Sequence, residues 1–281
     1  DRLVALGERR LPGSNAPAGG RDPLAMSSIA PQNYMDWVAQ QQVFESMAAI
    51  AGRGVTLHEP GGEPEDVRGQ AVTAPFFDVL RVQPAIGRAF TAENEIEGRE
   101  RVVVLSDGLW RRRFGGDPSV IGRTIPLEGA SYEIIGVMPP AFAYPVSSAR
   151  PTDLWVPYVV PANQRVRNPR EFSFYLQSIA RLKPGVSLVE AQAQMEQIAL
   201  ALEAEHPDWN KDRRIGVRPL RDHVRIQPQQ PVPQQFGKPV EHRQHTDKCC
   251  NSDGNAADRN GGDNRNQADL AFGPQIPPCN E

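Results

Sequence analysis

Residues 101–140 read RVVVLSDGLWRRRFGGDPSVIGRTIPLEGASYEIIGVMPP, and this stretch carries the strongest local signals for secondary structure in the chain. Residues 102–105 are wholly apolar and mostly β-branched, a pattern that predicts a strand buried on both faces. Ser106 follows as a helix N-cap, with Asp107 in the first turn, where the helix dipole favours a carboxylate. The stretch therefore predicts a strand that leads directly into a short helix.

The remainder of this stretch predicts the end of that helix and a pair of strands. Residues 107–114 give the helix an apolar surface, and two glycines at 115–116 stop it. Residues 124–127 and 132–137 are β-like, and the turn-prone sequence at 128–130 predicts a tight connection between them. We therefore expect a small α/β unit in this part of the chain.

Arg111, Arg112 and Arg113 lie at the C-terminal end of the predicted helix and allow two interpretations. They would form a phosphate or nucleic-acid patch, or they would offset the partial negative charge at the end of the helix. The whole chain has a net charge of -3, so its electrostatics give no support to nucleic-acid binding. We favour the interpretation that these arginines serve the helix end.

A second helix is predicted to begin at Pro31, whose fixed φ and missing N–H are harmless in a first turn. Mostly apolar residues recur at helical spacing from Tyr34 as far as Ala48. Tyr34 and Trp37 would suit a ligand-stacking pair, but at this spacing we interpret them as core residues.

The clearest helix signal in the sequence follows the turn at 183–185. Ser187 and Glu190 have the spacing of a capping box, and apolar residues then recur every three or four positions as far as Leu202. This narrow stripe would fit a coiled-coil seam, but it is short, so we favour packing against a sheet.

Several other segments are predicted from alternation or from short apolar runs. Trp155, in one of them, is expected to fill the core of a small domain. The further predicted strands are 2–8, 49–58, 66–73, 153–158, 172–182 and 215–220, and 75–80 is predicted as a short helix.

The composition changes beyond about residue 225, where the chain becomes rich in Gln, Pro, Asn, Asp and Gly. Such a segment has too few apolar residues to fill a core, so we expect disorder over 226–281. This tail also holds all three cysteines of the chain. A metal cluster could be suspected in it, but adjacent cysteines without a second knuckle indicate an accidental grouping. The residues concerned are His242, His245, Cys249 and Cys250.

No motif for catalysis or cofactor binding is visible in this sequence. It has no Walker A pattern, no GxSxG elbow, no HExxH and no convincing zinc spacing, and its carboxylates are scattered. We therefore nominate no catalytic, cofactor-binding or metal-binding residue, and we expect a chain that is not an enzyme. No apolar run approaches the ~20 residues needed to span a bilayer.

Several separate motifs, in the correct order, resemble one known family. They are VVVLSDGLWRRRFGGDPSVIGRTIPLEG with YEIIGVMPP, and also PQNYMDWVAQQQVFESMAAI, GGEPEDVRGQAVTAPFFDVLRVQPAIGRAF and ARLKPGVSLVEAQAQMEQIA. Together they resemble the MacB-like periplasmic core domain of ABC-transporter permeases, above all the large permeases of the acidobacterial type. The resemblance covers roughly residues 2–225. In such permeases a juxtamembrane stretch leads toward a transmembrane helix where this chain has its tail, so we expect a truncation or frameshift after about residue 225.

The resemblance implies an α+β fold in which a split, ferredoxin-like, porter-type subdomain receives an inserted small α/β subdomain. The two halves of the porter-like subdomain would be 1–81 and 161–225, and the insertion 82–160. It also implies a non-catalytic domain on the extracytoplasmic, periplasmic side of the bacterial inner membrane, which couples ATP-driven membrane motion to the efflux or release of substrate. The implied partners are an ABC ATPase, the membrane through the full-length permease, and in addition a second copy in a homodimer; no cofactor is implied.

Two other classes of function stay open from the residues alone. A free-standing periplasmic binding or assembly module would have the same fold without membrane helices. A hydrolase is the enzyme alternative, and it is weakened because no nucleophile and base form a visible set.

Overall fold

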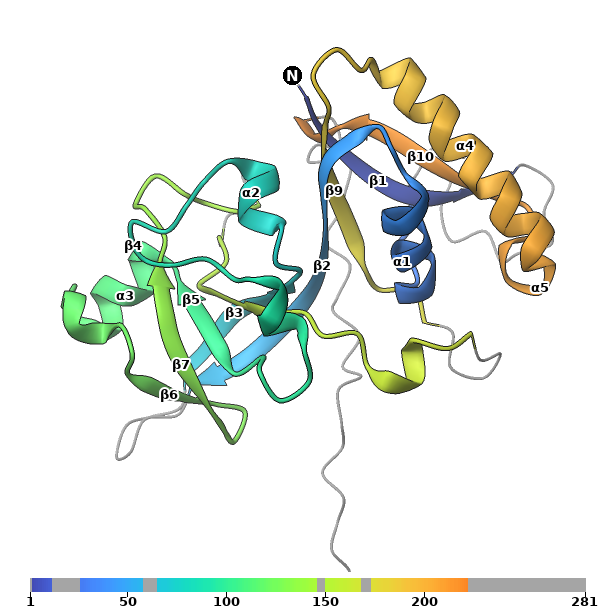
Figure 1. Cartoon of the computed structure of the whole chain (residues 1–281). Coiled ribbons are helices and arrows are strands. Elements are labelled where there is room, and N and C mark those ends of the chain that lie inside the picture. Colours follow the sequence, from blue (N-terminus) through green and yellow to red (C-terminus); the bar gives the residue numbers. More distant parts are fainter. Residues whose placement is uncertain (1, 12–25, 58–64, 146–149, 168–172, 222–281) are drawn as a thin grey trace, which may run out of the picture. The chain divides into compact units, whose positions relative to one another are not determined.

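The computed structural model describes residues 2–11, 26–57, 65–145, 150–167 and 173–221 (Figure 1). The predicted disorder of 226–281 and the candidate metal cluster at His242, His245, Cys249 and Cys250 lie outside these residues.

All the strands of the described residues join one ten-stranded sheet, in the order β10-β1-β9-β2-β3-β8-β5-β7-β4, with β6 paired to β2 and β7. The strands are β1 (Leu3–Arg10), β2 (Phe44–Leu57), β3 (Glu65–Val72), β4 (Ile86–Gly87), β5 (Val102–Leu105), β6 (Thr124–Leu127), β7 (Ala130–Val137), β8 (Leu154–Pro157), β9 (Gln177–Leu182) and β10 (Arg213–Pro219). The helices are α1 (Pro31–Gln40), α2 (Phe76–Leu80), α3 (Asp107–Phe114), α4 (Leu188–Glu205) and α5 (Pro207–Asn210). Three short 3-10 turns complete these elements: η1 (Ala92–Glu95), η2 (Pro118–Val120) and η3 (Ala162–Gln164).

One part of the sheet has the ferredoxin-like topology that the family resemblance implies. Its strands β10, β1, β9 and β2 lie side by side in this order and are antiparallel throughout. Along the chain, α1 connects β1 to β2 and α4 connects β9 to β10. Because β2 and β9 are separated by more than 100 residues of other elements, this βαβ–βαβ arrangement is split, as predicted.

The intervening residues extend the same sheet beyond β2. In this part β3 pairs with β8 and β5 pairs with β7 in parallel, whereas β2 pairs with β3 and β5 with β8 in antiparallel fashion. The 14-residue strand β2 takes part in both regions, because its first half pairs with β9 and its second half with β3 (Figure 1). The boundaries 1–81, 82–160 and 161–225 remain a prediction.

Two hydrophobic clusters cover the opposite faces of this sheet. On β2, Met47, Ala49 and Ala51 belong to one cluster, and the intervening Ala48 and Ile50 belong to the other. The period of two along a strand explains this division. The first cluster includes residues of α1, α3 and α4, and the second includes residues of α2. Each cluster therefore combines residues from both regions of the sheet.

The capping box of α4 is confirmed, because the Ser187 hydroxyl accepts from the Glu190 amide at 3.2 Å and the Glu190 carboxylate accepts from the Ser187 amide at 2.7 Å. The apolar stripe of this helix is also confirmed as a core face. Ala191, Met195 and Leu202 are buried in the first cluster, which also contains Ile215 and Val217 of β10. The stripe packs against the sheet, which is the interpretation preferred from the sequence.

Two predicted elements need correction. The helix predicted to continue toward Ala48 ends at Gln40, and Phe44 already begins β2. The Gln41 side chain accepts a hydrogen bond from the Phe44 amide at 2.9 Å, so the connection is a tight turn that the apolar spacing alone concealed. The strand predicted over 172–182 is shorter, because regular pairing starts only at Gln177 and is preceded by a single bridge between Ile29 and Leu176.

The local signals around α3 are confirmed. The Ser106 hydroxyl accepts from the Leu109 amide at 3.1 Å, and Gly115 ends the helix at a φ of 60°, in the left-handed region. Between β6 and β7, Glu128 and Gly129 have φ values of 50° and 80°, which is the signature of a tight hairpin turn.

The three arginines of α3 do more than serve the helix end. Arg111 pairs with Asp107 at 2.8 Å one turn earlier, as a surface residue of the helix would. Arg112, in contrast, contacts Glu65 at 3.0 Å and Asp153 at 3.2 Å, and Arg113 contacts Glu65 at 2.7 Å. The cations thus attach α3 to the beginnings of β3 and β8, a role that only the tertiary structure reveals.

We expect Arg112→Gln to lower the free energy of unfolding by about 1 kcal/mol, because a half-exposed guanidinium loses two carboxylate partners. Arg111→Gln, the matched control, should cost clearly less, because its single pair with Asp107 lies on the exposed helix surface, where solvent screens it. Urea denaturation measures both, and added salt should reduce the difference. Equal losses would show that the contacts with Glu65 and Asp153 add nothing to stability.

Candidate functional site

A cleft of about 620 Å³ lies where α1 and β2 meet the segments around η1 and after β8. Its walls are mainly apolar, and one tyrosine comes from each side. The lining residues are Tyr34, Met35, Val38, Met47, Thr73, Pro75, Glu95, Ile96, Glu97, Tyr158, Val160 and Arg165.

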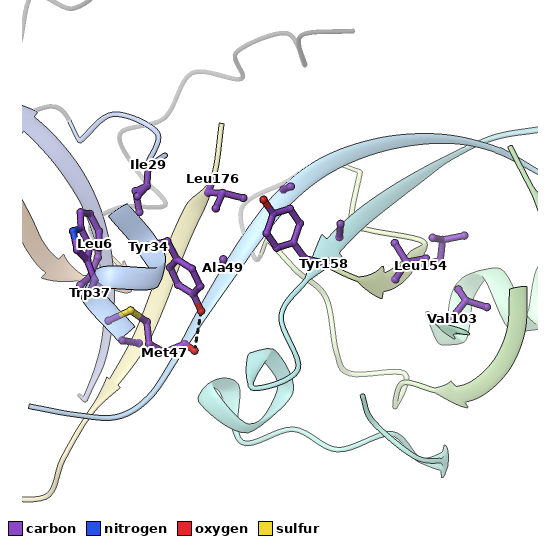
Figure 2. Packing of buried hydrophobic residues seen from close by; sticks show 14 of the residues in the cluster. Leu6, Ile29, Tyr34, Trp37, Met47, Ala49, Val103, Leu154, Tyr158 and Leu176 are labelled. Carbon is purple, nitrogen blue, oxygen red and sulfur yellow. Dashed lines mark hydrogen bonds between the residues drawn. The ribbon is translucent and has the colours of Figure 1, made fainter. Parts of the chain in front are cut away.

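Tyr34 provides a polar group within these apolar walls. Its ring, on α1, belongs to the first hydrophobic cluster, and its hydroxyl donates to the Met47 carbonyl at 3.3 Å (Figure 2). The same hydroxyl lies 3.4 Å from the Thr73 hydroxyl, which accepts from the Ala49 amide at 2.9 Å. Burial raises the pKa of Tyr34, so the phenol stays protonated. The hydroxyls of this cleft are therefore neutral and already hydrogen-bonded.

Glu95 is the partly buried charge of the cleft. One of its carboxylate oxygens accepts a hydrogen bond from the Ala74 amide, which ties η1 to the end of β3. Burial raises the pKa of Glu95, and the Ala74 hydrogen bond only partly opposes this effect. Among the described residues, no lysine or arginine forms an ion pair with this carboxylate.

The segment after β8 borders the cleft through a chain of hydroxyl contacts. The Tyr158 and Tyr175 hydroxyls lie 2.7 Å apart, and Tyr175 donates to Gln164 at 2.6 Å. Arg165 follows, and its Nε donates to the Val160 carbonyl at 3.0 Å. These contacts fix the backbone that leads from β8 back toward β9.

A second, buried polar cluster joins residues of β1, α1, α5 and β10. The Glu8 carboxylate accepts from Arg213 at 2.7 Å and from Asn33 at 2.8 Å, and Asn33 also donates to Asn210 at 2.9 Å. Burial raises the pKa of Glu8, and the Arg213 guanidinium opposes this shift. The charges are mutually paired, so we interpret the cluster as structural.

The residues weighed from the sequence as candidate ligand contacts do not form a joint site. Trp37 is buried in the core at 1% exposure, so Tyr34 and Trp37 are core residues as preferred, although Tyr34 also borders the cleft. Among the described residues, no group of three or more His, Cys, Asp or Glu side chains could hold a metal ion.

The model of one protein family, the MacB-like periplasmic core domain, matches residues 6–198 of this sequence. The chain belongs to this family. Its members are extracytoplasmic domains of MacB-like ABC-type permeases, as the resemblance implied. A comparison with curated protein sequences gives no match.

Solved structures share the fold of this MacB-like domain. The extracellular domain of the ABC-type transporter YknZ from Gram-positive bacteria has a TM-score of 0.52 at 16% identity, covering 76% of this chain and 99% of that chain. The periplasmic region of MacB from Actinobacillus actinomycetemcomitans has a TM-score of 0.53 at 15% identity, covering 81% of this chain and 94% of that chain. In the part of this MacB-like domain that the structure describes, no helix is both long and apolar enough to cross a bilayer.

Sequence reasoning did not find the cleft of this MacB-like domain. Val38 is one of the apolar residues whose helical spacing from Tyr34 predicted core packing, yet it is 43% exposed and borders the cleft. Met35, three positions earlier, is 40% exposed, and Ile96 is 51% exposed. Met35 and Val38, two apolar residues on the outer side of α1, were the only signal of the cleft that the sequence offered among these residues. Ile96 lies far from them in the sequence and comes near them only in the tertiary structure.

Proposed function

We propose that this domain transmits ATP-driven motion from the membrane part of an ABC-type permease to the extracytoplasmic side, where substrate is exported or released. The observation that carries this proposal is the strand β2, which pairs with β9 in its first half and with β3 in its second. A domain that transmits motion must be stiff between the points where force enters and leaves.

Several contacts support such stiffness at the middle of β2. Thr73 and Ala49 exchange hydrogen bonds there, because the Thr73 amide donates to the Ala49 carbonyl at 3.1 Å and the Thr73 hydroxyl accepts from the Ala49 amide at 2.9 Å. Both hydrophobic clusters also continue across β2. Because close-packed interiors have low compressibility, a displacement at one end of this sheet is passed on rather than absorbed.

The organisation and partners belong to the same proposal. The porter-like subdomain would comprise 1–81 and 161–225, with 82–160 as the inserted subdomain. The partner would be an ABC ATPase that acts through the membrane segments of the permease on the periplasmic side of the bacterial inner membrane. A homodimer would give the force two symmetric points of action.

Reconstitution of the complete permease tests this proposal. The permease that contains this domain is placed in vesicles with its ATPase, and substrate efflux is compared with and without residues 27–225. We expect efflux to be lost while ATP hydrolysis continues, because motion would no longer reach the extracytoplasmic side. Val189→Ala, an exposed position on α4, is the control and should leave efflux unchanged. Unimpaired efflux by the deletion would refute the proposal.

We further propose that the domain itself does no covalent chemistry. Within the described part of the chain, the most buried carboxylate is that of Glu8, and its ion pair with Arg213 supports a structural role for this cluster. The purified chain should therefore show no turnover above buffer with ATP or with ester, peptide and phosphate-ester substrates. Saturable turnover that a single substitution abolishes would contradict this expectation.

A further inference from the structure

The cleft next to α1 has the size and walls of a small-molecule site. Its volume of about 620 Å³ lies within the range typical of pockets that hold drug-sized ligands. Met35, Val38 and Ile96 expose 40–51% of their surface there, although apolar side chains of this size are usually buried. Met47 adds a flexible thioether chain, which adapts to ligands of different shape. The walls therefore suit an apolar body.

The charged residues of the cleft favour a ligand whose polar end carries a positive charge. Glu95 and Glu97 place two carboxylates in the lining against the single guanidinium of Arg165. Glu95 is partly buried, and the described residues supply it with no cationic partner. A partly desolvated carboxylate gains most from a charge-assisted hydrogen bond with a cation.

Other polar groups of the cleft already have hydrogen-bond partners within the protein. The Tyr34 hydroxyl is used by Met47 and Thr73, and the Thr73 hydroxyl by the Ala49 amide. The Nε of Arg165 is used by the Val160 carbonyl. Glu97 is exposed to solvent, so recognition of a charged group rests on the partly buried Glu95.

We propose that this cleft is a binding site for apolar amines, in which the aliphatic and aromatic walls hold the apolar body and Glu95 pairs with the protonated amine. This site goes beyond the proposed function, because binding of the amine needs neither the membrane segments nor the ATPase. Its success or failure is therefore independent of the outcome of the efflux experiment.

The methionines of the chain provide built-in reporters for a test. The full chain is labelled with ¹³C at the methionine methyl groups and titrated with 4-phenylbutylammonium by NMR. Met35 and Met47 line the cleft, whereas Met138 and Met195 are completely buried elsewhere and act as internal references. We expect saturable shifts at Met35 and Met47 and none at the references. The neutral 4-phenylbutanol and the anionic 4-phenylbutyrate should bind at least about tenfold more weakly, since a charge-assisted hydrogen bond is lost.

Two substitutions distinguish the effect of the Glu95 charge on binding from an effect on folding. Glu95→Gln keeps an oxygen that can accept from the Ala74 amide, so the chain should fold, but affinity for the amine should fall about tenfold or more. Glu93→Gln is the matched control, because Glu93 lies in the same turn, is exposed, and is not part of the cleft lining. The affinity of the Glu93→Gln chain for the amine should stay within about twofold of that of the unsubstituted chain, because a surface charge is screened by solvent.

Val38→Lys gives a second arm at a position that tolerates a polar side chain because it is 43% exposed. The new ammonium should block the wall and repel the amine, so binding should be lost while the methyl resonances of Met138 and Met195 stay unchanged. The proposal is overturned if the alcohol or the carboxylate binds as tightly as the amine. It is equally overturned if Glu95→Gln binds the amine undiminished, or if Met35 and Met47 show no saturable shift.

Discussion

Trp155→Ala is expected to lower the free energy of unfolding by about 3–5 kcal/mol, the range for emptying a large buried aromatic site. Trp155 lies on β8 with no exposed surface, and its ring centroid is 5.8 Å from that of Phe77 and 5.4 Å from that of Phe142. Its indole N–H also donates to the Gln70 side chain at 3.3 Å. The substitution would remove ring contacts and leave a cavity between α2 and the sheet.

Chemical denaturation of the full chain, followed by circular dichroism, measures this loss. Trp155→Phe should lower the free energy of unfolding less than Trp155→Ala does, because the phenyl ring of the new side chain retains part of the edge contacts with Phe77. Val189→Ala, at an exposed position, should stay within about 0.5 kcal/mol. A loss below about 1 kcal/mol for Trp155→Ala would show that this ring does not fill the core.

Glu8→Ala should be about as damaging, with an expected loss of about 3–5 kcal/mol, because it leaves a buried guanidinium without its counter-charge. Glu8 is 2% exposed, and the Arg213 side chain that pairs with it is 12% exposed. Asn33, which donates to the same carboxylate, would lose one of its two acceptors and keep Asn210. The cost would therefore come from unpaired polar groups rather than from lost apolar contacts.

A double-mutant cycle distinguishes these two sources. Glu8→Met and Arg213→Met are made singly and together, and their unfolding free energies are compared. We expect the double substitution to be less destabilising than the sum of the single ones by about 1–3 kcal/mol, because neither charge is then left alone. Strictly additive losses would mean that the two side chains do not interact in the folded chain.

The elements with strong local signals could be predicted from the sequence. The apolar run of β5, the Ser106 cap and the Gly115 stop of α3 each depend on neighbouring residues only, and the structure has them where the sequence predicted. The same holds for the capping box of α4 at Ser187. Family membership was also visible in the sequence, because several motifs occur together in the correct order.

Prediction was wrong where two types of element follow each other within a few residues. The apolar spacing from Tyr34 onward continues through the turn after Gln40, so it did not reveal that Phe44 begins a strand. Hydrophobic periodicity reports burial, and a helix and a strand that are buried by the same core produce overlapping patterns.

The sequence by itself determined most of the secondary elements, because caps, turns and apolar periods act over a few residues. The family was visible from several motifs in the correct order, and the split ferredoxin-like topology was implied by the resemblance to that family. Only the tertiary structure decided which distant charges meet. Glu8 and Arg213 are 205 positions apart, and Arg112 finds its partners 47 and 41 positions away. The cleft around Glu95 belongs to the same category, since α1, β2, η1 and the segment after β8 form it together. Such pairings depend on how the strands are ordered in the sheet, which no local pattern encodes.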